Sequence, residues 1–149
     1  MGAINQFVKK VGPDWLFMTV CYVLIDPARQ TFSYANGGRH FPFHYRVSSK
    51  ETIPLESTGP LLGIIPDMAY PAVERTSESG DLLVLYSDGN VEAENAQGEL
   101  FGETRLQQLI HAHAHLSPPD LKHKIVQVVH AFCQGVPQRD DVTLVVARL

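Results

Sequence analysis

The chain has 149 residues, of which 44% are hydrophobic and 19% are charged, and its formal net charge is −4. These values are typical of one globular domain with a hydrophobic core. An acidic chain without clustered Lys and Arg offers no general attraction for nucleic acid or an anionic membrane, so we expect neither as a partner.

The sequence predicts a soluble protein of the cytoplasm. It holds no apolar run of about 20 residues, which a membrane-spanning helix needs. The N-terminal segment MGAINQFVKK is too short and polar for a signal peptide. Cys21 and Cys133 lie in apolar segments without the spacing of a disulfide framework or a zinc site. We therefore expect both to be reduced core residues.

The first two-thirds of the chain is predicted to be mostly sheet. Helical spacing of apolar residues predicts a helix over residues 3–10, ended by Gly12-Pro13. β-branched and aromatic residues predict a strand over residues 16–26, which forms a hairpin with the segment TFSYAN. We interpret Trp15 and Phe17 as the packed start of that strand. Further extended segments are expected at residues 43–47, 52–55 and 69–76.

The last third is predicted to hold two strands and two helices. The segment LLVLYS, residues 82–87, is apolar on both faces and predicts a central strand covered on both sides. One helix is expected around Leu106 to Ile110, and a second follows Ser117, which is placed to cap it. Residues 142–147 are again apolar on both faces, which predicts a second two-sided buried strand.

Acidic residues stand at the ends of these two predicted strands. Asp88 follows the first strand, and the pair Asp140-Asp141 precedes the second. If the strands are antiparallel neighbours, the carboxylates meet at one rim of the sheet, where an all-oxygen set would suit Mg²⁺ or Mn²⁺. Gly89 would let the backbone approach the ion. The alternative is that Asp-Gly and Asp-Asp are ordinary turn residues on a solvated surface.

Four stretches of the chain resemble the later part of a metal-dependent protein phosphatase domain of the SpoIIE/RsbU type. They are INQF, FMTVCYVLIDPARQTFSYANGGRHFP, GPLLGIIPDMAYPAVERTSESGDLLVLYSDGNVEAENAQGELFGETRL and RDDVTLVVARL. The most specific part, Gly80 to Gly102, follows the family pattern Gly-Asp-Leu-Leu-x-Leu-Tyr-Thr/Ser-Asp-Gly-x-x-Glu-Ala-x-Asn and then Gly-Glu-x-Phe-Gly. The resemblance covers nearly the whole chain.

This resemblance implies an α/β layered fold like that of protein phosphatase 2C, with two antiparallel β-sheets in a sandwich flanked by helices. It also implies a binuclear Mn²⁺ or Mg²⁺ centre that hydrolyses phosphoserine or phosphothreonine on a protein. Asp88 and Asp140 match the family's metal-binding aspartates, with Gly89 beside them, and Asp141 is a secondary candidate. The metal-bound water is the nucleophile, so no catalytic side chain is expected.

The resemblance also implies partners. The expected substrate is a regulatory phosphoprotein such as an anti-sigma-factor antagonist, and the expected input is an attached or separate sensory or receiver domain. The alternative is a catalytically inactive module that keeps the fold and binds a regulatory phosphoprotein.

The chain departs from the family pattern at three places. The first metal motif, Gly-Asp-x-Ser-Gly-His-Gly, does not occur in it. We therefore expect a single domain over residues 1–149 that is the C-terminal portion of a SpoIIE-type domain, with an incomplete metal centre and little or no activity alone. Arg39 stands at the position of a family histidine, with His40 next, and either residue is open as a site residue. Asn90 replaces a commonly apolar residue and is expected to matter little.

Two further polar features are interpreted as structural. His111 and His115 are spaced to clip a transition metal on one helix face, but without a third ligand we interpret them as an exposed helix end. Asn36 is open as a left-handed turn residue or a site-lining amide, and we favour the turn.

Overall fold

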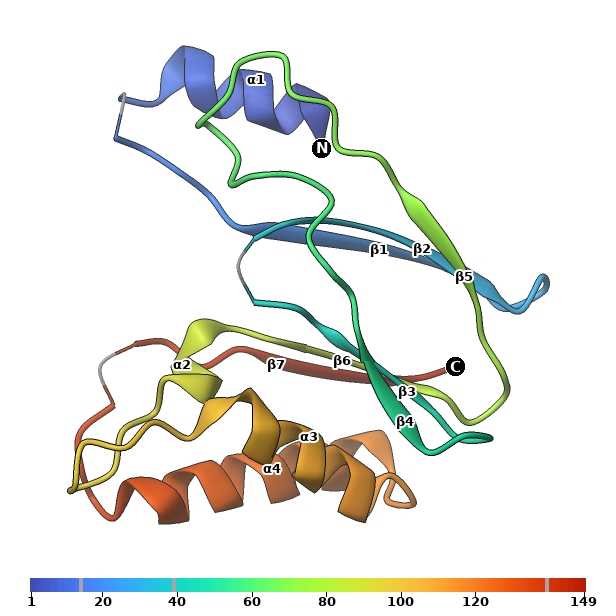
Figure 1. Cartoon of the computed structure of the whole chain (residues 1–149), viewed down its shortest axis with the longest axis vertical. Helices are drawn as coiled ribbons and strands as arrows, with labels where there is room; N and C mark the ends of the chain where they lie inside the picture. Colours follow the sequence, from blue (N-terminus) through green and yellow to red (C-terminus); the bar gives the residue numbers. More distant parts are fainter. Residues whose placement is uncertain (14, 39, 139) are drawn as a thin grey trace. The chain divides into compact units, whose positions relative to one another are not determined.

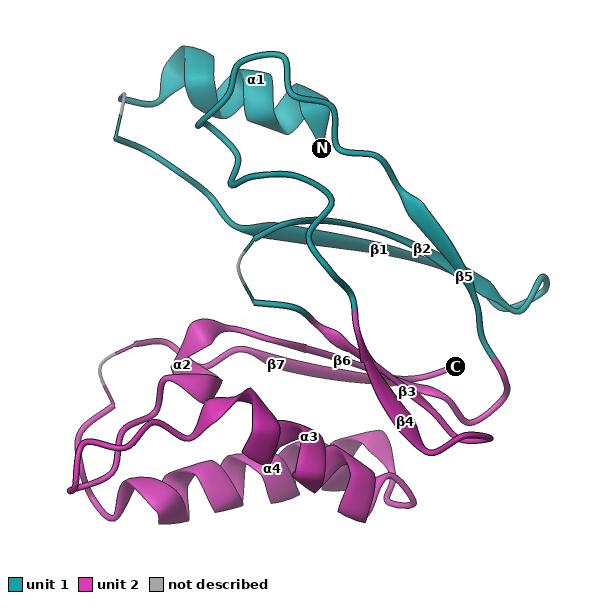
Figure 2. Ribbon diagram, viewed as in Figure 1, with its two compact units in different colours: residues 1–41, 55–77 teal, residues 42–54, 78–149 magenta. Residues whose placement is uncertain are grey.

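The computed structural model of the chain describes residues 1–13, 15–38, 40–138 and 140–149 (Figure 1). The chain divides into two compact units. The first comprises residues 1–41 and 55–77, and the second comprises residues 42–54 and 78–149 (Figure 2). Each unit combines an antiparallel sheet with helical structure, which is the mixture of elements that the family resemblance predicted.

The first unit is built on a three-stranded antiparallel sheet within the described residues. Its strands are β1 (Val20–Asp26), β2 (Thr31–Gly37) and β5 (Val73–Thr76), in the order β1-β2-β5. β1 and β2 form the predicted hairpin, with Val20 opposite Gly37 and Asp26 opposite Thr31.

Helix α1 (Gly2–Val11) is attached to its unit through the fully buried side chain of Asn5. The Asn5 amide nitrogen donates to the Ile65 carbonyl at 2.9 Å, and its amide oxygen accepts from the Gly63 N–H at 2.8 Å. Gly63 has a φ of +90°, and a Cβ there would lie 2.6 Å from the Leu16 carbonyl oxygen. Only glycine fits this close turn, so the loop can bring its N–H to Asn5.

The second unit is a four-stranded antiparallel sheet with helices packed on it (Figure 1). Its described strands run in the order β4-β3-β6-β7. They are β3 (Phe43–Arg46), β4 (Glu51–Pro54), β6 (Leu82–Tyr86) and β7 (Leu144–Arg148). The helices are α2 (Asp88–Val91), α3 (Gly102–His113) and α4 (Pro118–Cys133).

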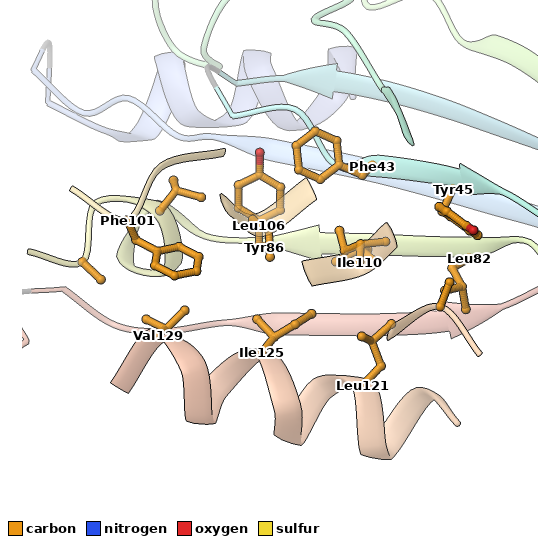
Figure 3. Close-up of a cluster of buried hydrophobic side chains, with 14 of the residues drawn as sticks. Phe43, Tyr45, Leu82, Tyr86, Phe101, Leu106, Ile110, Leu121, Ile125 and Val129 are labelled. Atoms are coloured by element: carbon orange, nitrogen blue, oxygen red, sulfur yellow. The ribbon is translucent and has the colours of Figure 1, made fainter. Parts of the chain in front are cut away.

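Strand β6 is the buried centre of the second unit, as its apolar sequence predicted. Leu82, Leu83 and Val84 have at most 1% of their surface exposed. Figure 3 shows Leu82 and Tyr86 of β6 in one cluster with side chains of α3 and α4. Because full burial of such a side chain contributes about 1.5–3 kcal/mol, this cluster holds β6 firmly in place.

Helix α4 begins where the sequence predicted. The Ser117 hydroxyl oxygen accepts from the Asp120 N–H at 3.3 Å, and Pro118 occupies the first turn. The buried face repeats every four residues, through Leu121, Ile125, Val129 and Cys133. The helix is therefore capped at its start and fixed along its length by one apolar stripe.

The prediction that the closing strand is buried on both faces is wrong. In the sheet formed by the described residues, β7 is an edge strand, and it begins two positions later than predicted. Val145 is 49% exposed and Val142 is 39% exposed. Since successive strand side chains point to opposite faces, only alternate residues of β7 face the helices of its unit.

Three predictions in the first unit are also wrong. Trp15 and Phe17 are 75% and 49% exposed, so they are not the packed start of a strand. Asn36 is not a turn residue, because it lies in β2 and is buried. Its amide nitrogen donates to the carbonyls of Leu55 at 3.1 Å and His40 at 3.3 Å. Asn36 thus joins the strand to two neighbouring segments of the same unit.

Both cysteines are free thiols, as predicted. Cys133 is buried, whereas Cys21 is half-buried, and burial raises the pKa of the Cys21 thiol to about 11. No helix within the described ranges is long and apolar enough to cross a bilayer.

Asp81 and His44 form a buried polar pair at the start of β6. His44 Nε2 lies 2.8 Å from Asp81 Oδ2, and both side chains are buried. Asp81 also accepts from the N–H groups of Val47 at 2.9 Å and Glu78 at 3.0 Å. Burial raises the pKa of Asp81, but the two backbone hydrogen bonds and His44 outweigh burial and hold that pKa below its ordinary value.

The exposure of Val145 predicts that a charge is tolerated there. Val145→Asp should lower the free energy of unfolding by only about 1 kcal/mol, since it disturbs strand propensity at a half-exposed position. Val84→Asp, at a fully buried position of the neighbouring strand, should cost at least about 3 kcal/mol. Urea denaturation followed by circular dichroism measures both. Equal losses in the two variants would contradict the edge position of β7.

The Asp81 pair predicts a specific acid sensitivity. Because the folded-state pKa of Asp81 is lowered, its stabilisation is fully present above the unfolded-state pKa of about 4. That stabilisation is lost as the pH falls through the folded-state value. Asp81→Asn should lower the free energy of unfolding by about 1–3 kcal/mol at neutral pH and should flatten the decline in stability on acidification. Denaturation series at several pH values test this, and an acid slope equal to that of the wild type would count against it.

Candidate metal centre

The candidate site lies where β6 ends and the segment leading into β7 begins. The two strands are antiparallel neighbours, with Tyr86 opposite Leu144, which confirms the arrangement on which the sequence prediction depended. Beyond this pair, the Ser87 N–H donates to the Thr143 carbonyl at 3.0 Å. Asp88 therefore follows one strand at the same edge where Asp140 and Asp141 precede the other.

The Ser87 side chain joins the two segments. Its hydroxyl donates to the Asp141 carbonyl at 2.9 Å and accepts from the Thr143 N–H at 2.9 Å. One hydroxyl thus satisfies a backbone donor and a backbone acceptor on the facing segment. These two bonds hold the backbone on either side of Val142 against the strand end that carries Asp88.

Asn90 reinforces this contact, although the sequence reasoning assigned it little importance. It is 1% exposed, and its amide nitrogen donates to the Thr143 carbonyl at 2.7 Å and the Ser87 carbonyl at 3.2 Å. The signal in the sequence was a polar amide at a position that is commonly apolar in the family. A buried amide of this kind needs hydrogen-bonding partners, and here they come from both sides of the edge.

Gly89 is required by the close approach of the two segments. A Cβ at this position would lie 2.5 Å from the Asp141 carbonyl oxygen and 3.1 Å from the Asp140 carbonyl oxygen. Any larger residue would push the backbone of the acidic pair away. The close approach in the structure is one of protein backbone, and the predicted approach to an ion stays a prediction.

The two principal carboxylates are exposed at this edge. Asp88 and Asp140 are both solvent-accessible, and Asp88 Oδ1 accepts from the Gly89 N–H at 3.0 Å. A small pocket adjoins them, and its lining residues are Gly89, Glu92, Ala93, Glu94, Pro137 and Asp140. The described lining thus includes the acidic residues Glu92, Glu94 and Asp140, and carboxylate oxygens are the ligands that Mg²⁺ and Mn²⁺ prefer.

These residues are of the types that bind a divalent cation, but the described part of the chain gathers too few of them here. Within the part of the chain that the structure describes, no group of three or more His, Cys, Asp or Glu side chains is placed to hold a metal ion. Two adjacent divalent cations need several carboxylates to balance their charge. The edge can thus supply one part of a binuclear centre.

The other predicted site residues lie in several places. Arg39 lies outside the described residues, and His40 is half-buried in the first unit. The His111 ring packs edge-on against Tyr45, with centroids 6.2 Å apart, and His115 lies beside His113. Both residues are exposed, and α3 ends at His113, so the prediction of an exposed helix end is confirmed.

Comparisons of the chain with known proteins agree on one family. The profile described as Stage II sporulation protein E (SpoIIE) matches residues 1–149. Phosphoserine phosphatase RsbU of Bacillus subtilis is 30% identical over 145 residues, which cover 97% of this chain and 43% of RsbU. The SiaA-PP2C domain of Pseudomonas aeruginosa aligns with a TM-score of 0.81 at 21% identity, over 99% of this chain and 60% of that one.

A structure of the SpoIIE phosphatase domain from Bacillus subtilis, presoaked with Mn, aligns with a TM-score of 0.65 at 17% identity, over 99% of this chain and 72% of that one. At these identities the structural matches bear on the fold alone, and they agree with the two antiparallel sheets and helices described above. The chain spans less than half the length of the curated relatives it matches. Since the family profile matches residues 1–149, the chain belongs to the SpoIIE family.

Proposed function

We propose that the chain is the C-terminal portion of a metal-dependent protein serine/threonine phosphatase domain that acts in bacterial signalling. The observation that carries this proposal is the edge at which Ser87 hydrogen-bonds the Asp140–Thr143 segment beside Asp88. The family match supports it, and so does the relative RsbU, which is described as a phosphoserine phosphatase. The match covers 43% of RsbU, so the remaining ligands are assigned to a segment that precedes this one.

In this proposal, Asp88 and Asp140 hold Mn²⁺ or Mg²⁺. The presoaking of the SpoIIE phosphatase domain with Mn supports a divalent cation. When bound, such cations orient the phosphoryl group and lower the pKa of a coordinated water. The chain's own contribution is to present exposed carboxylates from a buried strand, because a rigid element positions a ligand better than a loop. Asp141 has a different role, since its carbonyl is bound by Ser87.

The proposed substrate is a regulatory phosphoprotein in the cytoplasm, such as an anti-sigma-factor antagonist. RsbU is a phosphoserine phosphatase by name, and a solved relative from Mycobacterium tuberculosis joins RsbU and RsbW domains in one protein, Rv1364c. These relatives support a signalling protein as partner. An attached sensory or receiver domain would supply the input.

One observation favours a second candidate function, a catalytically inactive module that binds a phosphoprotein. No three-ligand cluster occurs among the described residues. Reading the gene upstream of Met1 separates the two candidates, because an in-frame Gly-Asp-x-Ser-Gly-His-Gly motif favours the enzyme and its absence favours the module.

The proposed ligands predict a ranked loss of activity in the full-length protein. Asp88→Asn and Asp140→Asn should each lower Mn²⁺-dependent turnover of p-nitrophenyl phosphate by about 10²-fold or more, because each removes a charged ligand. Asp141→Asn should lower it less, since its role at the edge is played by the backbone carbonyl. Steady-state rates over a Mn²⁺ titration measure this, and wild-type turnover in the Asp88 variant would refute the assignment.

Gly89 predicts a different kind of defect. Gly89→Ala should displace the Asp140–Asp141 backbone and raise the Mn²⁺ concentration for half-maximal activity by about tenfold. Gly2→Ala is a matched control, since its added Cβ would meet no atom closer than 3.9 Å. Both proteins are compared by Mn²⁺-dependent rates and thermal melting. An unchanged Mn²⁺ requirement in Gly89→Ala would show that the close backbone approach does not position the ligand.

A further inference from the structure

An apolar groove lies in the second unit beside the acidic edge. It is formed by one side of α4, the segment that follows α4, and the residues next to the two acidic positions. The described lining residues are Asn90, Val126, Val129, His130, Cys133, Gly135, Val136, Pro137, Gln138 and Val142.

The groove has a buried floor and exposed apolar walls. Val129 and Cys133 are 7% and 9% exposed and belong to the core, whereas Val126 and Val142 are 44% and 39% exposed. None of the described lining residues is an Asp, Glu, Lys or Arg. Exposed apolar surface inside a concave site is a common mark of a binding surface, and this one suits an uncharged, apolar group.

The groove is continuous with the proposed metal site. Pro137 lines both the groove and the small pocket that contains Gly89 and Asp140. Asn90 directly follows Gly89 in the chain, and Val142 directly follows Asp141. The residues that neighbour a phosphorylated residue at the acidic edge are therefore within reach of the groove.

We propose that this groove binds an apolar side chain of the phosphoprotein substrate, in the extended segment beside the phosphorylated residue. The inference rests on the proposed phosphatase function and adds a determinant of sequence preference to it. Its basis is the shared Pro137 boundary together with the absence of Asp, Glu, Lys and Arg from the described lining. The phosphate is held by the metal edge, and the flanking apolar side chain sets the register of the peptide.

The experiment uses the full-length protein and phosphoserine peptides of one common sequence. A single leucine is moved through the positions on both sides of the phosphoserine, with serine as the reference at each position. Burial of a leucine side chain in the groove should raise kcat/KM about tenfold at one position, mainly through a lower KM. Hydrolysis of p-nitrophenyl phosphate, which has no flanking residue, tests the proposed function separately.

Val126→Asp tests the groove, because it places a charge on one wall at an exposed position. In this variant, kcat/KM for the leucine peptide should be about equal to kcat/KM for the serine reference peptide. Gln127→Asp is the matched control, since Gln127 is exposed on the same helix but does not line the groove, and it should keep the preference. Thermal melting confirms that both variants are folded.

The outcomes separate the two proposals. Hydrolysis of p-nitrophenyl phosphate with no leucine preference at any position would overturn the groove assignment and leave the phosphatase function standing. A preference that persists in Val126→Asp would also overturn the groove assignment. Failure of the wild type to hydrolyse any of these phosphate esters would overturn the proposed function, and the groove assignment with it.

Discussion

The acidic edge depends on the Ser87 hydroxyl. This group donates to the Asp141 carbonyl and accepts from the Thr143 N–H. It therefore extends the contact between the two segments past the last paired residues of β6 and β7. A single hydroxyl can serve both roles because it is a donor and an acceptor at once. Because the hydroxyl reaches the Asp141 carbonyl, it fixes the backbone next to Asp140, beyond the point that the backbone bond from Ser87 to Thr143 reaches.

The rest of the second unit gives this contact a fixed base. Leu82, Val84 and Tyr86 of β6 pack in one cluster with side chains of α3 and α4 (Figure 3). At the opposite end of the strand, Asp81 is bound to His44 of β3. At the acidic end, Asn90 adds a second bond to Thr143, and the missing side chain of Gly89 lets the backbones touch. Rigidity is thus concentrated in the backbone, while the carboxylates of Asp88 and Asp140 stay exposed to solvent. This combination suits a metal edge, because ligands must be positioned yet accessible.

Much of this arrangement could be predicted from sequence, and the errors have physical reasons. The two-sided apolar run of β6 and the Ser117 cap follow from local patterns, whereas the pairing of β6 with β7 was a condition that only the structure supplied. The exposure of Val145 could not be predicted, because an apolar run does not say whether its strand is central or at an edge. Asn36 and Asn90 were misjudged for a related reason: their hydrogen-bonding partners lie on segments distant in sequence. The closeness of Gly89 to Asp141 is likewise a tertiary property.

The proposed role of this edge is to supply part of a divalent metal centre. The most direct test is anomalous X-ray diffraction at the manganese absorption edge, from crystals of the full-length protein grown with Mn²⁺. If these two residues hold the metal, anomalous density should lie in direct contact with the carboxylate oxygens of Asp88 and Asp140. Manganese peaks at other residues, with none at these two carboxylates, would contradict it.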